Sequence, residues 1–372
     1  MINTQEFYNY LINKNLNFFV GVPDSLLKNI CACIKMNSPD CNNIIAANEG
    51  NAIGIVSGYH ISTGKFGVVY MQNSGQGNAV NPLLSLADED VCRIPMLLMI
   101  GWRGEPGVKD EPQHVKQGKV TLPLLEAMGI EYRILEENYQ AQIDCCYQYM
   151  SENKKPIALI VKKGSFSEYK IAKAEPRYSM LREEALESII SGIGGGSFIV
   201  STTGKTSREI FEIRERRGEG HAHDFLTVGS MGHTASIALG MSLGTEKDVY
   251  CIDGDGSFIM HMGGMGIVAK NARENLKYIL INNGAHESVG GQPTVGFDID
   301  IKNILLSVGF RNVYTASTKN EVEQCIDRLK SEKQGALIVY VNQGSRDDLG
   351  RPTIAPEQNK TDMMRLFGSI RD

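Results

Sequence analysis

Short apolar runs and helix-like segments alternate along the first half of the chain. The runs are rich in Val, Ile, Leu and Met and have no regularly spaced polar positions, which is typical of strands buried on both faces of a parallel sheet. They lie at residues 44–47, 66–71, 96–100 and 156–161, and the helix-like segments lie between them at 49–62, 79–87 and 115–128. This alternation predicts βα units built around a parallel sheet.

The second half of the chain repeats the pattern with its own apolar runs. They lie at residues 197–201, 225–228, 249–252, 278–281 and 336–341. Between the halves, residues 162–178 are polar, charged and contain a proline, which is typical of a linker. A chain of 372 residues is also too long for one ordinary core. We therefore predict two α/β domains, residues 1–175 and 176–372, each a mainly parallel sheet flanked by helices.

Charge and cysteine content argue against several classes of protein. The net charge is −5, the isoelectric point is about 5.9 and the basic residues are scattered, so a nucleic-acid partner is not expected. The 8 cysteines show no paired Cys-x-x-Cys spacing, as expected for reduced thiols. The first residues do not resemble an export signal, and the strongest apolar run, 94–100, is far shorter than the roughly 20 residues of a membrane span. We expect a cytoplasmic protein without a membrane segment.

Polar residues with ligand chemistry follow two runs of the second half. Gly254-Asp255-Gly256-Ser257 comes after the run 249–252, and Asn282-Asn283 comes after the run 278–281. A helix-like segment at 258–270 separates the runs, so a right-handed crossover would make them neighbours with their carboxyl ends at one edge of the sheet. Asp255 and Asn283 would then face one crevice, with oxygen atoms that suit Mg²⁺ and glycines that admit a diphosphate. Alone, a Gly-Asp-Gly tripeptide more often only ends a strand in a turn.

The combination of the two motifs resembles the cofactor-anchoring motif of thiamine diphosphate enzymes. The resemblance implies thiamine diphosphate and Mg²⁺ as cofactors, with Asp255, Asn283 and the backbone carbonyl of Ala285 as metal ligands. The continuation at 284–294, Gly-Ala-His-Glu-Ser-Val-Gly-Gly-Gln-Pro-Thr, resembles the branch that decarboxylates phosphonopyruvate or sulfopyruvate. The chain would then consist of two thiamine diphosphate-binding-fold domains. Residues 1–175 would bind the pyrimidine and residues 176–372 the diphosphate.

The same resemblance implies catalytic roles for three residues. Glu49 would bind N1′ of the aminopyrimidine and favour the tautomer that takes the proton from C2 of the thiazolium ring. Alone, an acidic residue at such a helix start more often interacts with the helix dipole. His114 and His286 are the candidates for acid–base catalysis and for contact with the substrate, although either one alone is as often an ordinary loop histidine. His114 is expected in a polar loop after the run 96–100.

Other residues would bind the cofactor or the substrate. By resemblance, the Gly229 carbonyl would accept a hydrogen bond from the 4′-amino group, and Met231 would wedge under the cofactor, although Met more often packs in a core. The remaining implied contacts are those of Asn73 with the pyrimidine, Asp24 and Ser25 with the substrate, and Ser230, Gly254, Gly256 and Ser257 with the cofactor.

The segment 201–206, Ser-Thr-Thr-Gly-Lys-Thr, is a candidate anion site. It is not a Walker A loop, because Ile199 stands where that motif needs glycine. It does follow an apolar run and begin a helix, and helix N-termini expose N–H groups to anions. We therefore expect Thr202 and Thr203 to contact the diphosphate.

The resemblance implies decarboxylation of a small 2-oxo acid that carries a tetrahedral anionic group. The favoured substrate is 3-phosphonopyruvate, converted to phosphonoacetaldehyde and CO₂ within phosphonate (2-aminoethylphosphonate) biosynthesis, because both domains lie on one chain. The alternatives are sulfopyruvate as substrate, giving sulfoacetaldehyde, and a non-catalytic thiamine diphosphate-binding protein. Lys109, Lys205 and Arg208 are weak candidates for phosphonate contact, since each is more often a solvated charge. A homodimer or higher homo-oligomer is expected, with active sites at the protomer interface.

Overall fold

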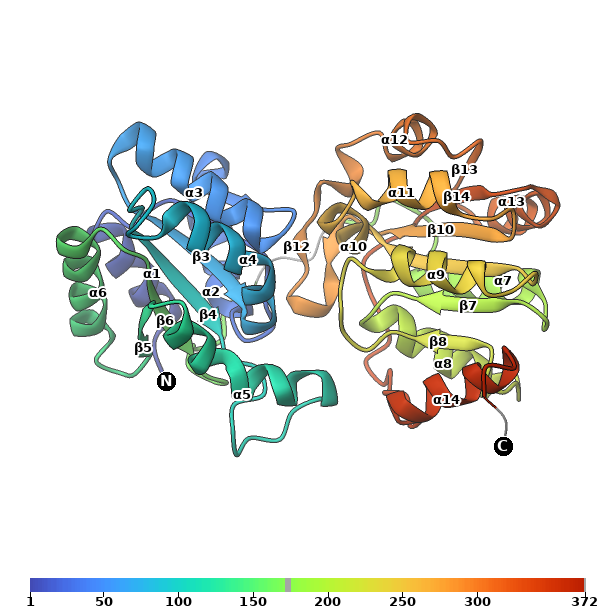
Figure 1. Ribbon diagram of the computed structural model, residues 1–372, viewed down its shortest axis with the longest axis horizontal. Coiled ribbons are helices and arrows are strands. Elements are labelled where there is room, and N and C mark those ends of the chain that lie inside the picture. The colour runs from blue at the N-terminus through green and yellow to red at the C-terminus, as the bar shows by residue number, and fades with distance from the viewer. Residues whose placement is uncertain (171–174, 371–372) are drawn as a thin grey trace. The chain divides into compact units, whose positions relative to one another are not determined.

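The computed structural model describes residues 1–170 and 175–370, and the chain divides into two compact units. Unit 1 comprises Met1–Lys173 with Val289–Gln292, and unit 2 comprises Ala174–Ser288 with Pro293–Asp372. Each unit contains a six-stranded sheet flanked by helices (Figure 1), which confirms the predicted α/β class. The predicted domain boundary at residue 175 adjoins residues 171–174, which lie outside the described ranges, and it stays a prediction.

The sheet of unit 1 consists of parallel strand pairs. Leu97 and Met99 enter one core, whereas Leu98 and Ile100 of the same strand enter the other. Because both faces are covered, no position of this strand needs to be polar, and this explains the unbroken apolar runs of the sequence. In spatial order the strands are β2 (Asn43–Ile45), β1 (Phe19–Gly21), β3 (Gly67–Gln72), β4 (Met96–Gly101), β6 (Ile157–Val161) and β5 (Glu131–Ile134).

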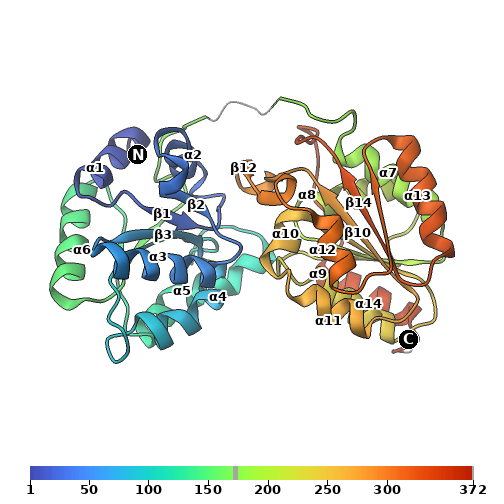
Figure 2. The same cartoon turned by 90° about the horizontal axis from the view of Figure 1, so that it is seen from above.

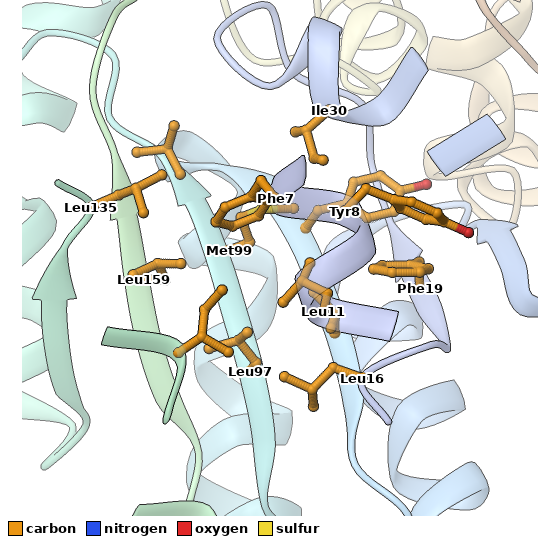
Figure 3. Packing of buried hydrophobic residues seen from close by; sticks show 14 of the residues in the cluster. Phe7, Tyr8, Leu11, Leu16, Phe19, Ile30, Leu97, Met99, Leu135 and Leu159 are labelled. Atoms are coloured by element: carbon orange, nitrogen blue, oxygen red, sulfur yellow. The ribbon is translucent and has the colours of Figure 1, made fainter. Parts of the chain in front are cut away.

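Helices cover both faces of this sheet. Figure 3 shows one of the two cores, in which Phe7 and Leu11 pack near Leu97 and Met99 of β4. Phe7 is fully buried, and burying a side chain of this size contributes about 2–3 kcal/mol. One face carries α1 (Thr4–Asn13), α2 (Lys28–Asn37) and α6 (Tyr139–Asn153), and the other carries α3 (Glu49–Thr63), α4 (Gln76–Pro82) and α5 (Pro112–Ala127) (Figure 2).

Unit 2 repeats this layered arrangement around a second set of parallel strand pairs. The strands are, in spatial order, β13 (Asn312–Ala316), β14 (Gly335–Tyr340), β10 (Leu276–Asn282), β9 (Val249–Gly254), β7 (Phe198–Ser201) and β8 (Asp224–Leu226). One core contains α7 (Arg182–Ile193), α8 (Lys205–Arg216) and α13 (Lys319–Ser331), and the other contains α9 (Thr234–Leu243), α11 (Gly264–Asn271), α12 (Ile301–Ser307) and α14 (Pro356–Leu366). None of the helices described in either unit has the length and apolarity that a membrane crossing requires.

The structure confirms the central prediction about unit 2 and corrects one helix. β9 and β10 are parallel neighbours, as the two motifs require. The helix-like segment 258–270 is instead two helices, α10 (Asp255–Met260) and α11, because helical backbone is interrupted at His261. Five strands of the described residues were not predicted: β1 has three residues, β11 (Ala285–His286) and β12 (Gln292–Pro293) have two each, and β5 and β13 are edge strands whose polar side chains hide the apolar signal.

Candidate active site

The carboxyl ends of β9 and β10 bring the predicted metal ligands of unit 2 to one edge of the sheet. Ile281 of β10 pairs with Gly254 of β9, so Asp255 and Asn283 both follow directly from neighbouring strands. Asp255 is the first residue of α10, is 3% exposed, and accepts a hydrogen bond from the hydroxyl of Thr294. In parallel α/β sheets this edge is where ligands bind.

The predicted ligands form a set of hard oxygen donors. They are the carboxylate of Asp255, the amide oxygen of Asn283 and the carbonyl of Ala285. Burial raises the pKa of Asp255 to about 6, because it removes the water that would solvate the charged form. A divalent cation would offset that cost, and oxygen donors of this kind suit Mg²⁺. No group of three His, Cys, Asp or Glu among the described residues can hold a metal, so a cation here would need amide, carbonyl and ligand oxygens.

The side chain of Asn283 is held at both ends. Its Oδ1 accepts a hydrogen bond from the N–H of Ala285 at 3.1 Å, and its Nδ2 donates to Oε2 of Glu287 at 2.9 Å. Glu287 begins the short helix η4 (Glu287–Val289) and was not among the predicted site residues. Its position four residues after Asn283 was the one sequence signal for this contact. Its other partners, Arg182 and Lys205, come from distant parts of the chain.

Beside these donors, Gly256 packs closely against two of the predicted site residues. A Cβ on Gly256 would lie 2.8 Å from Cε1 of His286 and 3.1 Å from Cε of Met231, so a side chain would not fit there. The hydroxyl of Ser257 accepts a hydrogen bond from the N–H of Gly232 at 3.1 Å. This bond ties the loop that carries Met231 to α10, and the structure thus brings Met231, Gly256, Ser257 and His286 together.

The end of β7 reaches the same turn. The N–H of Thr202 donates to the carbonyl of Ile252 at 2.8 Å, and a Cβ on Gly254 would lie 3.8 Å from Cγ2 of Thr202. Ser230 has a φ of 56°, a conformation that is uncommon outside glycine. The contacts of Thr202, Thr203, Gly229, Ser230 and Gly254 with a cofactor stay predictions.

Glu49 is a buried carboxyl group of unit 1. It is the first residue of α3, is 5% exposed, and accepts a hydrogen bond from Nδ2 of Asn78 at 2.7 Å. A Cβ on Gly75 would lie 2.2 Å from Oε1 of Glu49, so the carboxyl group rests against bare backbone. Burial raises the pKa of Glu49, and the Asn78 bond only partly offsets this. Such a group is suited to hold a proton against a ring nitrogen.

The side-chain amide of Asn73 forms hydrogen bonds within unit 1. Its Nδ2 donates to the carbonyl of Arg103 and to the hydroxyl of Thr121, both at 2.8 Å, and its Oδ1 accepts from the N–H of Arg103 at 3.1 Å. Asn73 therefore joins the loop after β4 to the turn that carries Gly75. Its predicted contact with the pyrimidine stays a prediction.

Arg103 organises the predicted substrate residues of unit 1. Its Nε and Nη2 donate to the two oxygens of Asp110 at 2.8 Å and 2.5 Å, and its Nη1 donates to Oγ of Ser25 at 2.8 Å. Asp24 is fully buried, and burial raises its pKa to about 6, although the N–H of Leu26 and the charge of Arg103 oppose the rise. Sequence reasoning missed Arg103, even though it follows a strand end, where ligands commonly bind.

His114 lies in the first turn of α5 and not in the predicted loop. The helix begins at Pro112, whose fixed φ and missing N–H suit the first helical position. Burial, with a further effect of Arg103, lowers the pKa of His114 to about 4, and burial lowers the pKa of His286 to about 4. Both imidazoles are therefore neutral at neutral pH.

Lys205, a weak candidate for phosphonate contact, is engaged within unit 2. Its Nζ donates to Oε1 of Glu287 at 2.9 Å and to Oγ of Ser345 at 2.7 Å. Lys109 is exposed and Arg208 is partly exposed. The residues predicted from the sequence thus form two clusters, one in each unit: Asp24, Ser25, Glu49, Asn73 and His114 in unit 1, and the metal and cofactor residues with His286 in unit 2.

Two family descriptions match the chain. Residues 4–123 match the "Thiamine pyrophosphate enzyme, N-terminal TPP binding domain", and residues 202–341 match the "Thiamine pyrophosphate enzyme, C-terminal TPP binding domain". The first range lies in unit 1 and nearly all of the second lies in unit 2. The predicted fold of two thiamine diphosphate-binding domains is confirmed.

Named relatives extend the similarity over nearly the whole chain. The chain is 29% identical to a phosphonopyruvate decarboxylase of Streptomyces viridochromogenes, over 96% of this chain and 93% of the relative. It is 28% identical to a sulfopyruvate decarboxylase of Methanosarcina acetivorans, over 91% of this chain and 90% of the relative. It is also 35% identical to the sulfopyruvate decarboxylase subunit alpha of Methanocaldococcus jannaschii, over 41% of this chain and 89% of that subunit. The first two alignments span both clusters.

Proposed function

Because the chain belongs to the thiamine diphosphate-dependent phosphonopyruvate and sulfopyruvate decarboxylases, we propose that it converts 3-phosphonopyruvate to phosphonoacetaldehyde and CO₂ with Mg²⁺ as the second cofactor. The observation that supports this choice of substrate is the match to the Streptomyces relative, which covers 96% of this chain. The second candidate substrate is sulfopyruvate, which the Methanosarcina match favours. The proposed setting is phosphonate biosynthesis in the cytoplasm.

Unit 2 would hold the metal and the diphosphate. Asp255, Asn283 and the Ala285 carbonyl would bind Mg²⁺, and Gly254, where a Cβ would meet no atom closer than 3.8 Å, would let the diphosphate approach the backbone. When bound, thiamine diphosphate supplies the ring that accepts the electron pair released with CO₂. Met231 and His286 flank Gly256, so they would orient the cofactor and exclude water from it.

Three kinds of group would hold or move protons. Glu49 would hold a proton at N1′ of the aminopyrimidine, which its raised pKa favours. His114 and His286, with pKa values near 4, would stay neutral at neutral pH and would accept hydrogen bonds. Asp24, whose pKa burial raises to about 6, is matched to donate a proton to the product near neutral pH.

We further propose a homodimer or higher homo-oligomer in which unit 1 of one protomer and unit 2 of another complete each active site. The alpha and beta subunits of the Methanocaldococcus jannaschii sulfopyruvate decarboxylase match 41% and 42% of this chain, and this support for a site built from more than one chain comes from that relative. Sedimentation of the cofactor-bound protein tests it, with a dimer or larger species expected. An active monomer would refute the shared site.

The experiment that tests the substrate is aldehyde formation from phosphonopyruvate and sulfopyruvate side by side, with thiamine diphosphate and Mg²⁺ present or withheld. We expect turnover of phosphonopyruvate that depends on both cofactors and exceeds turnover of sulfopyruvate. A preference for sulfopyruvate would keep the mechanism and replace the substrate. Turnover that is unchanged when Mg²⁺ is chelated would contradict the metal assignment.

A further inference from the structure

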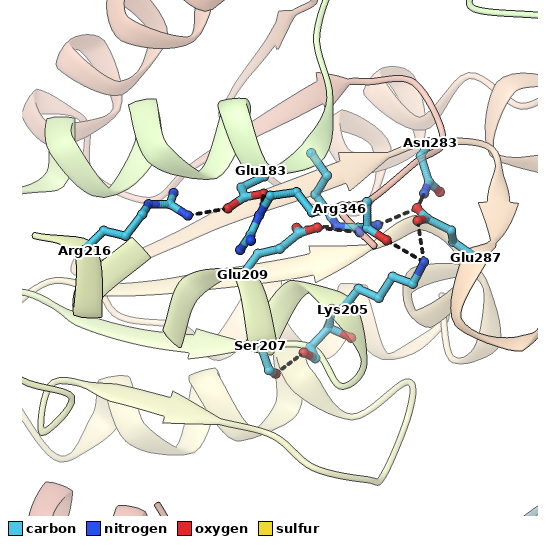
Figure 4. Close-up of polar contacts among 11 residues, drawn as sticks. Glu183, Lys205, Ser207, Glu209, Arg216, Asn283, Glu287 and Arg346 are labelled. Carbon is cyan, nitrogen blue, oxygen red and sulfur yellow. Dashed lines mark hydrogen bonds and ion pairs between the residues drawn. The ribbon is translucent and has the colours of Figure 1, made fainter. Parts of the chain in front are cut away.

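A network of buried ion pairs lies at the same sheet edge as the metal donors, with Glu287 at its centre. Oε2 of Glu287 accepts hydrogen bonds from Nη1 of Arg182 at 2.7 Å and from Nδ2 of Asn283 at 2.9 Å, and Oε1 accepts from Nζ of Lys205 at 2.9 Å. Figure 4 shows Glu287 between Asn283 and Lys205. The side chain of Glu287 is only 11% exposed, so its charge depends on these partners.

The cations that hold Glu287 are themselves anchored. Nε and Nη2 of Arg182 donate to the two oxygens of Glu209 at 2.6 Å and 2.8 Å, and the two side chains are 6% and 0% exposed. This paired geometry fixes the plane of the guanidinium group and leaves Nη1 for Glu287. Lys205 is held in addition by Oγ of Ser345. Arg182 and Lys205 therefore hold the Glu287 carboxylate in place independently of its contact with Asn283.

Asn283 has two amide orientations, and its neighbours select one. In the observed orientation, Oδ1 faces the N–H of Ala285 and Nδ2 faces the carboxylate of Glu287, so both contacts are hydrogen bonds. A half-turn of the amide would place oxygen against the carboxylate and nitrogen against the N–H, which are two repulsive contacts. A metal ligand must present its oxygen beside the Ala285 backbone, and that is the orientation that Glu287 enforces.

We propose that Glu287 is a positioning residue that fixes the amide of Asn283 for Mg²⁺ and links the metal site to the Arg182–Glu209 pair. This inference rests on the proposed cofactor chemistry of the same site. Glu287 would act on the metal only through its hydrogen bond with Asn283. Outer partners of metal ligands commonly change metal affinity 10- to 100-fold when they are replaced.

The test uses two variants of the full-length protein. Glu287→Asp keeps the negative charge between Arg182 and Lys205 but is one methylene shorter and loses its reach to Asn283. Glu287→Gln keeps the length and replaces one acceptor oxygen with a donor. Calorimetric titration of thiamine diphosphate at a series of Mg²⁺ concentrations, without substrate, measures the Mg²⁺ needed for half-maximal binding. We expect this concentration to rise about 10- to 100-fold in both variants.

A merely structural role would give a different result. If Glu287 positions Asn283, saturating Mg²⁺ restores thiamine diphosphate binding in both variants, and the melting temperature of Glu287→Asp without cofactors falls by no more than about 4 °C. If Glu287 only supports the fold, excess Mg²⁺ does not restore binding.

Glu183→Gln is the matched control. Glu183 also lies in unit 2, is 15% exposed, and pairs with two arginines, Arg216 at 2.6 Å and Arg346 at 2.8 Å (Figure 4). The Glu183→Gln variant should leave the Mg²⁺ dependence of thiamine diphosphate binding unchanged. Wild-type Mg²⁺ dependence in both Glu287 variants, or an equal shift in Glu183→Gln, would overturn the inference. A wild-type protein that binds thiamine diphosphate but does not turn over phosphonopyruvate would reject the substrate alone, because this test contains no substrate.

Discussion

Glu49 in unit 1 and Glu287 in unit 2 are two glutamates with little exposure and opposite surroundings. Glu49 accepts a hydrogen bond from the neutral amide of Asn78, and burial raises its pKa. Burial acts on Glu287 in the same direction, but Arg182 and Lys205 more than offset it and hold its pKa below the ordinary value. One residue type thus serves two purposes: near a neutral partner glutamate can exchange a proton, and between cations it is a permanent charge that fixes its neighbours.

The largest effect that would sharpen this comparison is expected from Glu49→Gln. The variant keeps the shape of the side chain but cannot hold the proton at the pyrimidine, so kcat should fall about 100- to 10,000-fold. Because a buried group with a raised pKa is costly to ionise, unfolding stability at neutral pH should not fall. Steady-state kinetics and urea unfolding measure the two quantities, with the exposed Glu152→Gln as control. Near-normal turnover would remove Glu49 from the mechanism.

The next effect concerns the buried ion pairs of unit 2. Glu209→Gln weakens the buried pair that anchors Arg182, and we expect a loss of about 3 kcal/mol in the free energy of unfolding. Asp327→Asn breaks the exposed pair with Lys330, whose side chains are 75% and 40% exposed, and should cost less than about 1 kcal/mol. Urea unfolding of the cofactor-free protein measures both. Equal losses in the free energy of unfolding would mean that the buried pair contributes no more to stability than the exposed pair.

The smallest effect is a dependence of stability on pH that arises in unit 1. The pKa of Asp24 is raised to about 6 in the folded protein, above its value of about 3.9 in an unfolded chain, so the protonated carboxyl favours folding. That stability is fully present below about pH 4 and is lost as the pH rises through about 6.

Asp24→Asn cannot ionise, so it should remove about 2 kcal/mol of the fall in stability between about pH 4 and pH 7. Urea unfolding of the cofactor-free protein at several pH values measures this, with the exposed Asp90→Asn as control. Parallel pH curves for the wild type and Asp24→Asn would show that Asp24 does not titrate in this range.

The sequence predicted the centre of unit 2 well because its signals are local. The apolar runs before Asp255 and Asn283 are strands buried on both faces, and the rule for parallel crossovers makes them neighbours. The short edge strands β5 and β13 gave no such signal, because exposed or half-buried side chains interrupt their apolar positions. A contiguous pattern therefore predicted where the candidate metal ligands lie, whereas strand detection failed for the partly exposed edge strands and for the short buried strand β1.

The contacts around the site could not be read from the sequence for a different reason. Asp110 is seven residues from Arg103, but Ser25 is 78 residues away, and Arg182 is 105 residues from Glu287. Such pairs depend on how the whole unit packs and leave no spacing pattern in the sequence. His114 was placed in a loop because its neighbours are polar, and the helix start at Pro112 outweighed that polarity.

The bare backbone of Gly75 has a consequence for the variation that this chain can tolerate. Any side chain at that position would begin 2.2 Å from Oε1 of Glu49, so even alanine would displace the carboxyl group. Gly75 carries no reactive atom, yet a mutational scan scored by activity should find position 75 almost as intolerant as position 49. A position without a side chain can therefore be as constrained as the buried residue that it contacts.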